Sequence, residues 1–194
     1  WKFSTFAGIT NSFGSINDVY NGFILLSAKN LSSRNTDIQQ TRSNFVGSRL
    51  EYRNPLNNIF FNVSYNFNDR TNNVTFLNEL DEASQQFIIK GYNLENNSKT
   101  NSARTELGKY FPKFKTNASV GYNYSLNNYQ QLPANSTPTE SSFIDVEGVN
   151  QGVSVKFNNN YFSWLSVDYN ANWNFNNTKS PDDARFNNKT NSFN

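Results

Sequence analysis

The chain alternates apolar and polar residues over long stretches. In LSVDYNANWNF (165–175) one parity is wholly polar, and the other carries Leu165, Val167, Tyr169, Ala171, Trp173 and Phe175. Successive side chains of a β-strand point to opposite faces, so a period of two predicts a strand. The two faces of this strand should therefore meet very different surroundings.

The same alternation recurs along the chain. It is clear in VGSRLEYR (46–53), IFFNVSYNF (59–67), KTNASVGYNYSL (115–126) and QGVSVKFN (151–158), and weaker in SARTELGKY (102–110). With an opening strand over Trp1–Gly8, these segments predict about seven strands. A further strand begins at 189–194.

The connections alternate in length. Short ones lie at 54–58, 111–114 and 158–163, and long polar ones at about 70–98, 128–148 and 177–188, with another at 9–42. This order predicts an antiparallel meander with all tight turns at one end. Within the first long connection, residues 15–33 fit either a short helix begun by Ser15 or Asn17, or a pair of strands.

Two architectures suit repeated alternating strands. In a soluble sandwich the apolar face packs on a second sheet, whereas in a transmembrane barrel it meets lipid. The run from Leu165 to Phe175 would span roughly 33 Å, which covers about 25 Å when tilted as in a barrel. Length, turn asymmetry and ring placement all favour an all-β, antiparallel transmembrane β-barrel. We expect residues 1–194 to be one part of a larger barrel.

The aromatic residues gather toward the two ends of the strands, with smaller residues between them, as in barrels that cross two membrane–water interfaces. Phe60 belongs to the group beside the short turns. The side chains expected to face lipid or form the girdles are Tyr52, Phe61, Tyr65, Phe67, Tyr122, Tyr124, Trp164, Tyr169, Trp173 and Phe175.

The opposite parity carries polar and charged residues. Those expected to face the lumen are Arg49, Glu51, Arg53, Arg104, Glu106, Lys156, Asp168, Asn170 and Asn172. They would line a permeation path or contact an enclosed domain. Alternatively, the charges pair across neighbouring strands and the asparagines form a hydrated wall without a specific ligand.

Composition narrows the chemistry. The 194 residues include 18 Phe, 10 Tyr and 3 Trp, but neither Cys nor His, and the net charge is only +2. Without imidazole or thiolate groups, most nucleophilic catalysis and most zinc sites are excluded. We expect no catalytic site, no metal and no cofactor. Because the net charge is this small and the sequence has no basic cluster, we expect no nucleic-acid partner.

Four phrases resemble one known family. They are INDVYNGFILLSAKNLSS (16–33), LEYRNPLNNIFFNVSYNFN (50–68), KYFPKFKTNASVGYNYS (109–125) and NNYFSWLSVDYNANWNF (159–175). They are similar to the barrel of Bacteroidota-type TonB-dependent outer-membrane receptors, the SusC-like proteins. The resemblance covers most of residues 15–176 and consists of strand-and-turn phrases.

The resemblance implies a location in the outer membrane of a Gram-negative bacterium. Family members form a 22-strand barrel around a plug domain and import a bound nutrient ligand with energy delivered through TonB. Many pair with a SusD-like surface lipoprotein. Expected partners are thus outer-membrane lipid, the chain's own plug, TonB and such a lipoprotein. No plug is readable in these residues, so a barrel-wall segment is expected.

Two other functions stay open. One is a non-transporting outer-membrane barrel that serves an export or surface complex. The other is a soluble β-protein that binds glycans through its exposed rings. Partition into membranes separates the second from the rest.

Overall fold

The fold is described from a computed structural model of the chain. The structure describes residues 1–15, 19, 22, 24–27, 30–33, 36–81, 86–133, 138–139, 142–162, 164–179 and 186–193. In these residues the chain is almost wholly β-structure, with one 3₁₀ turn, η2 (Pro112–Phe114). The described residues contain no helix that is long and apolar enough to cross a membrane.

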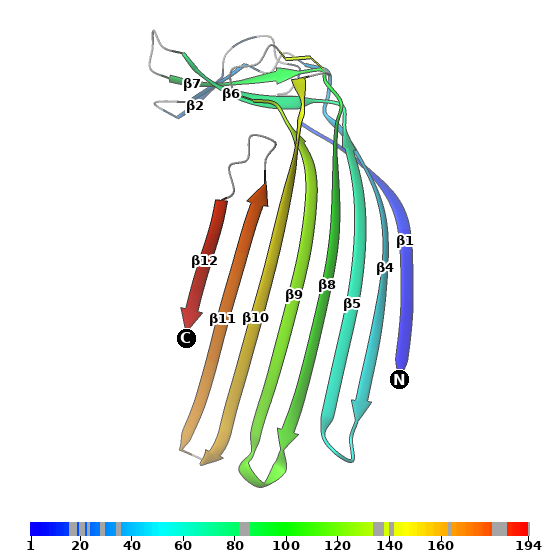
Figure 1. The fold of residues 1–194 in the computed structure, drawn as a ribbon, viewed down its shortest axis with the longest axis vertical. Coiled ribbons are helices and arrows are strands. Elements are labelled where there is room, and N and C mark those ends of the chain that lie inside the picture. The colour runs from blue at the N-terminus through cyan, green and yellow to red at the C-terminus, as the bar shows by residue number, and fades with distance from the viewer. Residues whose placement is uncertain are drawn as a thin grey trace.

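One large sheet of eight strands dominates the molecule (Figure 1). In spatial order its strands are β1 (Lys2–Phe13), β4 (Gln40–Asn54), β5 (Ile59–Asn72), β8 (Asn96–Phe111), β9 (Thr116–Gln131), β10 (Ile144–Phe162), β11 (Leu165–Lys179) and β12 (Phe186–Phe193). Every neighbouring pair is antiparallel. The all-β, antiparallel prediction is confirmed. β1 and β12 are the two edges, and closure into a barrel stays a prediction.

A small second sheet lies at the upper end of Figure 1. Its order is β2 (Ile24–Ser27), β3 (Asn30–Ser33), β7 (Gln86–Tyr92) and β6 (Thr75–Asp81), and β3 pairs with β7 in parallel. The connections expected at 9–42 and 70–98 therefore contain strands of their own, and the prediction of a polar loop over 70–98 was wrong. Over residues 24–33 the strand-pair alternative is the observed one, while Asn17 lies outside the described residues.

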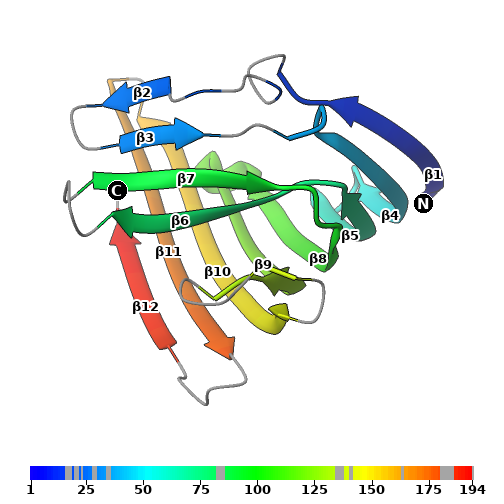
Figure 2. The same cartoon turned by 90° about the horizontal axis from the view of Figure 1, so that it is seen from above.

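The small sheet grows out of the large one. Two residues, Asn73 and Val74, separate β5 from β6, and three separate β7 from β8. The long β5–β8 pair thus continues into the β6–β7 hairpin after a bend. Seen from above, the small sheet lies across the hollow of the curved large sheet (Figure 2).

Side-chain hydrogen bonds hold this bend. The Thr41 hydroxyl donates to Asn72 Oδ1 at 2.7 Å, and Asn72 Nδ2 donates to Asn96 Oδ1 at 2.8 Å. Asn96 Nδ2 then donates to the Thr75 hydroxyl of β6 at 2.6 Å. Thr41, Asn72 and Asn96 share one face of the large sheet, because Thr41 pairs directly with Asn72 and Asn72 pairs directly with Asn96. The small sheet is folded over that face.

The buried apolar residues lie mainly where the two sheets meet. Among the described residues, the buried hydrophobic side chains are Val74, Leu77, Leu132, Val146 and Ala171. The first two belong to the bend and β6, and Leu132 and Val146 border the upper ends of β9 and β10. Below this junction the large sheet is a single layer. A conventional core is therefore confined to one end of the molecule.

Candidate functional surfaces

The pairing register divides the large sheet into two faces. On β5 one face carries Asn62, Ser64 and Asn66, and the other carries Phe61 and Val63. Directly opposed residues of antiparallel strands share a face, so these assignments extend across the sheet. We call the face of Asn62 the polar face and the face of Phe61 the apolar face.

The polar face collects the nine polar residues that the alternation predicted for a lumen. Arg49 and Arg104 flank Ser64 in one cross-strand row, and Glu51 and Glu106 flank Asn62 in the next. The others are in register with these rows or lie an even number of residues from them: Arg53, Lys156, Asp168, Asn170 and Asn172. Whether this face lines a lumen stays a prediction.

Charge pairing on the polar face runs along a strand. Arg49 Nε lies 2.8 Å from Glu51 Oε1, two residues away on β4. In the described part of the polar face this is the one ion pair found, so the expected pairing across neighbouring strands does not occur there. Asn158 donates to the Asp168 carboxylate across β10 and β11. Arg104, Glu106 and Lys156 form no ion pair within the described residues.

Two shallow depressions mark this face. One, of about 460 Å³, brings Arg49, Arg104 and Glu106 together with Asn62 and Ser64. The other, of about 310 Å³, is lined by polar side chains that include Glu106, Lys156, Asp168 and Asn170. Glu106 borders both, so the depressions adjoin. Glu51, Arg53 and Asn172 line neither. The Asn62 Oδ1 atom is shielded and has no hydrogen-bond partner among the described residues.

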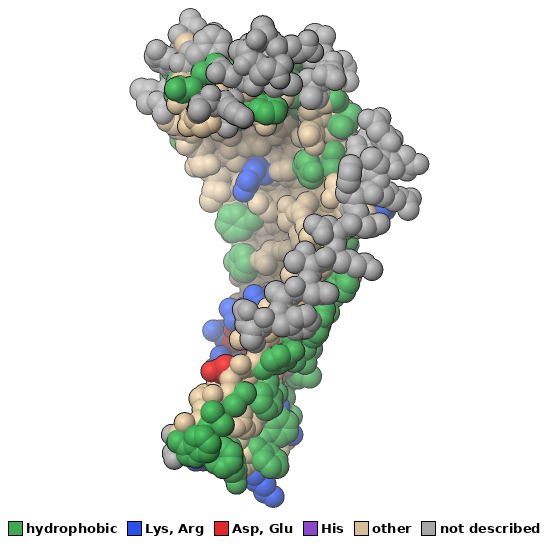
Figure 3. Space-filling model, turned by 90° about the vertical axis from the view of Figure 1, so that its left-hand side faces the viewer, with side chains coloured by type: hydrophobic (Ala, Val, Ile, Leu, Met, Phe, Trp, Pro, Cys, Tyr) green, Lys and Arg blue, Asp and Glu red, His purple; other side chains and the backbone are tan. Residues whose placement is uncertain are grey.

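The apolar face carries nine of the ten residues predicted for lipid contact or girdles. Trp164 is the exception, because it lies in the turn before β11 and belongs to neither face. The face is uncovered by other described elements, and Leu107 and Val120 in mid-sheet keep 54% and 53% of their surface exposed. Figure 3 shows hydrophobic side chains gathered along the lower half of the sheet.

Phe60, one of the rings expected beside the short turns, lies there but on the polar face. Its parity is that of Asn62, and it is paired with Gly108 on the polar face. A Cβ atom at Gly108 would lie only 2.0 Å from the Phe60 ring, so the ring covers the glycine. The same arrangement joins Phe6 to Gly47 and Phe45 to Gly8. Aromatic rings of the polar face thus fill the space that glycine leaves.

The apolar face contains a band without charged side chains. On β5 the band comprises Phe61, Val63, Tyr65 and Phe67, and the rows in register with these residues on β4, β8, β9, β10 and β11 also lack charges. The next row above holds Asp69, Lys99, Glu147 and Lys179, with Lys179 Nζ 3.4 Å from Glu147 Oε1. The next row below holds Lys109.

Charged side chains also meet in the small sheet. Lys90 Nζ lies 2.5 Å from Glu79 Oε2, and the Tyr92 hydroxyl donates to Glu79 Oε1 at 2.9 Å. The hydrogen bond from Lys90 lowers the pKa of Glu79, whereas burial and then Glu79 raise the pKa of Tyr92. Sequence reasoning missed this cluster because it treated residues 70–98 as a loop.

Searches for a metal site in the described residues and for similar proteins both gave negative results. The described residues contain no group of three or more Asp, Glu, His or Cys side chains able to hold a metal ion. Comparisons with family models, curated proteins and solved structures found no match to this chain.

Proposed function

We propose that the large sheet is a wall of an outer-membrane β-barrel, with the apolar face toward lipid and the polar face toward the lumen. One observation carries the proposal. Across four rows of six strands, the apolar face has no charge and is overlaid by no other described element, while charges at the same heights, such as Arg49, Glu51 and Arg104, lie on the polar face. Hydrocarbon on one side and water on the other require this segregation.

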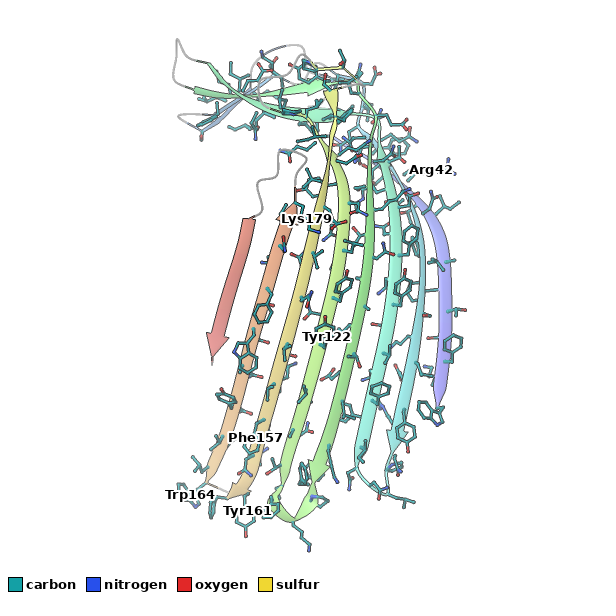
Figure 4. All side chains as sticks on the ribbon, in the orientation of Figure 1. Arg42, Tyr122, Phe157, Tyr161, Trp164 and Lys179 are labelled. Atoms are coloured by element: carbon teal, nitrogen blue, oxygen red, sulfur yellow. The ribbon has the colours of Figure 1, made fainter. Side chains whose placement is uncertain are left out.

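The height of the band supports the same proposal. Lys109 and Lys99 border it on β8 and are ten residues apart, which corresponds to about 33 Å of strand. A strand tilted by about 40° covers about 25 Å of that along the membrane normal, the height of a typical barrel's apolar band. Figure 4 places Phe157, Tyr161 and Trp164 toward the lower end and Arg42 and Lys179 toward the upper end.

The more specific proposal is that the wall belongs to a TonB-dependent transporter that imports a bound nutrient ligand. It rests on the SusC-like phrases of the sequence. The polar face would then meet the transporter's own plug domain, and the small sheet, which folds over that face, would cover the mouth of the lumen. TonB and a SusD-like surface lipoprotein are the further partners implied. The chain itself would have no enzymatic role and no cofactor.

Paired spin labels test the membrane wall. With the protein in bilayers, a label at Leu107 or Val120 should be relaxed by oxygen dissolved in the acyl chains. A label at Arg104 or Asn123, in the same span but on the polar face, should be relaxed by a water-soluble nickel chelate. Recovery of the protein in buffer without detergent, with aqueous access on both faces, would instead select the soluble glycan-binding alternative.

Transport is tested separately in cells. Deleting the gene should reproduce part of the nutrient-uptake defect caused by loss of TonB, and restoring the gene should repair it. A barrel that passes the labelling test but copurifies with an export or surface complex, and whose deletion leaves uptake intact, would favour the non-transporting alternative.

A further inference from the structure

Positive charge predominates at the short-turn end of the large sheet. Asp168, in register with Asn117, lies there on the polar face and accepts a hydrogen bond from Asn158. Lys109, Lys113 and Lys115 surround the β8–β9 turn, and Arg53 is the last residue but one of β4. No Asp or Glu occurs within 52–61, 107–119 or 157–167, the three segments that meet at this end. The opposite end mixes both signs, as in the row with Asp69, Lys99, Glu147 and Lys179. The two ends of the sheet therefore differ in charge.

Exposed apolar side chains are interleaved with these cations. Leu56 is 91% exposed, Phe114 61% and Trp164 77%. Tyr161, Phe162 and Trp164 form a continuous ring cluster, with successive ring centroids 5.0 and 5.6 Å apart. Lys109 Nζ lies 5.3 Å from the centre of the Phe111 ring. A surface of amphipathic rings beside lysines suits the boundary between hydrocarbon and lipid headgroups.

Hydrogen bonds join the three turns into one surface. The Tyr110 amide donates to the Asn58 carbonyl at 2.9 Å, which connects the β8–β9 turn to the β4–β5 turn. The Asn160 amide donates to the Lys115 carbonyl at 3.1 Å, and Asn159 Nδ2 donates to the Phe114 carbonyl at 2.9 Å. The lysines are thus held beside the rings by backbone contacts before any partner binds.

We propose that this end binds the headgroups of anionic phospholipids in the leaflet that surrounds the short turns. The proposal rests on the membrane-wall function above and names a lipid class for one of its two rims. The lysine ammonium groups would contact lipid phosphates, and the rings would lie at the level of the ester groups. No Asp or Glu lies in the short turns or on the apolar face at this end to oppose the attraction, since Asp168 is on the polar face. Each basic residue near an anionic surface contributes about 1 kcal/mol.

Native tryptophans provide the test. A W1F/W173F variant keeps Trp164 as the reporter of the short-turn end. The whole protein is reconstituted in phosphatidylcholine vesicles that contain a minor fraction of either brominated phosphatidylglycerol or brominated phosphatidylcholine. Trp164 should be quenched more strongly by the anionic lipid. K113Q/K115Q should reduce this preference by roughly fivefold per lysine, the equivalent of about 1 kcal/mol each.

The opposite rim supplies the matched control. K99Q/K179Q removes the same charge from the upper row and should leave Trp164 quenching unchanged, whereas added salt should weaken it. Equal quenching by both brominated lipids, or a preference that survives K113Q/K115Q, overturns the proposal. A W1F/W164F variant reports on the wall itself through Trp173. If neither brominated lipid quenches Trp173, the membrane-wall function fails.

Discussion

At the scale of single residues, phenylalanine rings that pack over glycines of the neighbouring strand stabilise the strand pairing. We expect Gly108→Ala to lower the free energy of unfolding by about 1–3 kcal/mol, because its Cβ would displace the Phe60 ring. Gly148→Ala is the control, since its Cβ would approach nothing closer than the Asn127 carbonyl oxygen at 3.8 Å. The control should be neutral or stabilised by up to about 1 kcal/mol. Urea titration of both variants measures the difference, and equal effects would contradict the contact.

Parity predicted the faces of individual residues well wherever a residue lies inside a strand. Tyr65 and Asp168 lie on opposite faces as the alternation required. Phe60 was grouped only by its place beside a short turn, and its parity with Asn62 puts it on the polar face. Trp164 lies outside the strand altogether, so alternation could not assign it. The contact between Phe60 and Gly108 depends on strand register, which one sequence does not reveal.

At the scale of elements, the bend between the sheets depends on Asn96. Replacing it with Ala removes the acceptor of Asn72 and a donor to Thr75. We expect the β6–β7 hairpin to open more easily by about 1–3 kcal/mol, seen as faster amide exchange at 75–81 and 86–92. Asn97→Ala alters an exposed neighbour whose side chain bonds Thr71 on the apolar face. Exchange of the hairpin should not respond to that control.

The same hairpin should respond to pH at both extremes. Because the folded pKa of Glu79 lies below 4.5, its stabilisation is present above that pH and is lost as the pH falls through the lower folded value. Because the folded pKa of Tyr92 lies above 10.0, its contribution is present below pH 10.0 and is lost as the pH rises through the raised value. Amide exchange corrected for intrinsic pH effects should show both losses in β6 and β7. Glu79→Gln should abolish the acid limb, and an unchanged limb would contradict the assignment.

The β6–β7 hairpin of the small sheet was missed because its strands are short and lack alternation. In TFLNELD (75–81), Phe76 and Leu77 are adjacent, and in QFIIKGY (86–92) Phe87, Ile88 and Ile89 follow one another. Apolar residues therefore occupy both parities, and a period of two does not appear. The parallel pairing of β3 with β7 joins segments more than fifty residues apart, which local pattern cannot reveal.

At the scale of the whole molecule, the charged side chains and the band of apolar side chains lie on opposite faces of the large sheet. This arrangement fits a sheet between lipid and water better than a sheet surrounded by water alone. A soluble sheet gains by covering exposed apolar side chains such as Leu107 and Val120 with a second layer. Here the buried apolar residues lie mainly at the junction with the small sheet, and the rest of the large sheet is uncovered in the described residues. Alternation and turn length were sufficient to predict this separation. Closure of the sheet depends on strand pairing at the β1 and β12 edges.

A single arginine distinguishes a lipid-facing surface from a water-facing one. Val120→Arg places a charge near the middle of the charge-free band, where we expect a cost of about 2–4 kcal/mol in lipid. Asn123→Arg adds the same charge to the polar face, beside Arg104 and Gly152 in register, where water can solvate it. In vesicles, Val120→Arg should lower the yield of folded, heat-modifiable protein well below that of Asn123→Arg. A soluble sheet would show the reverse order, because arginine at Val120 would only replace an exposed apolar group.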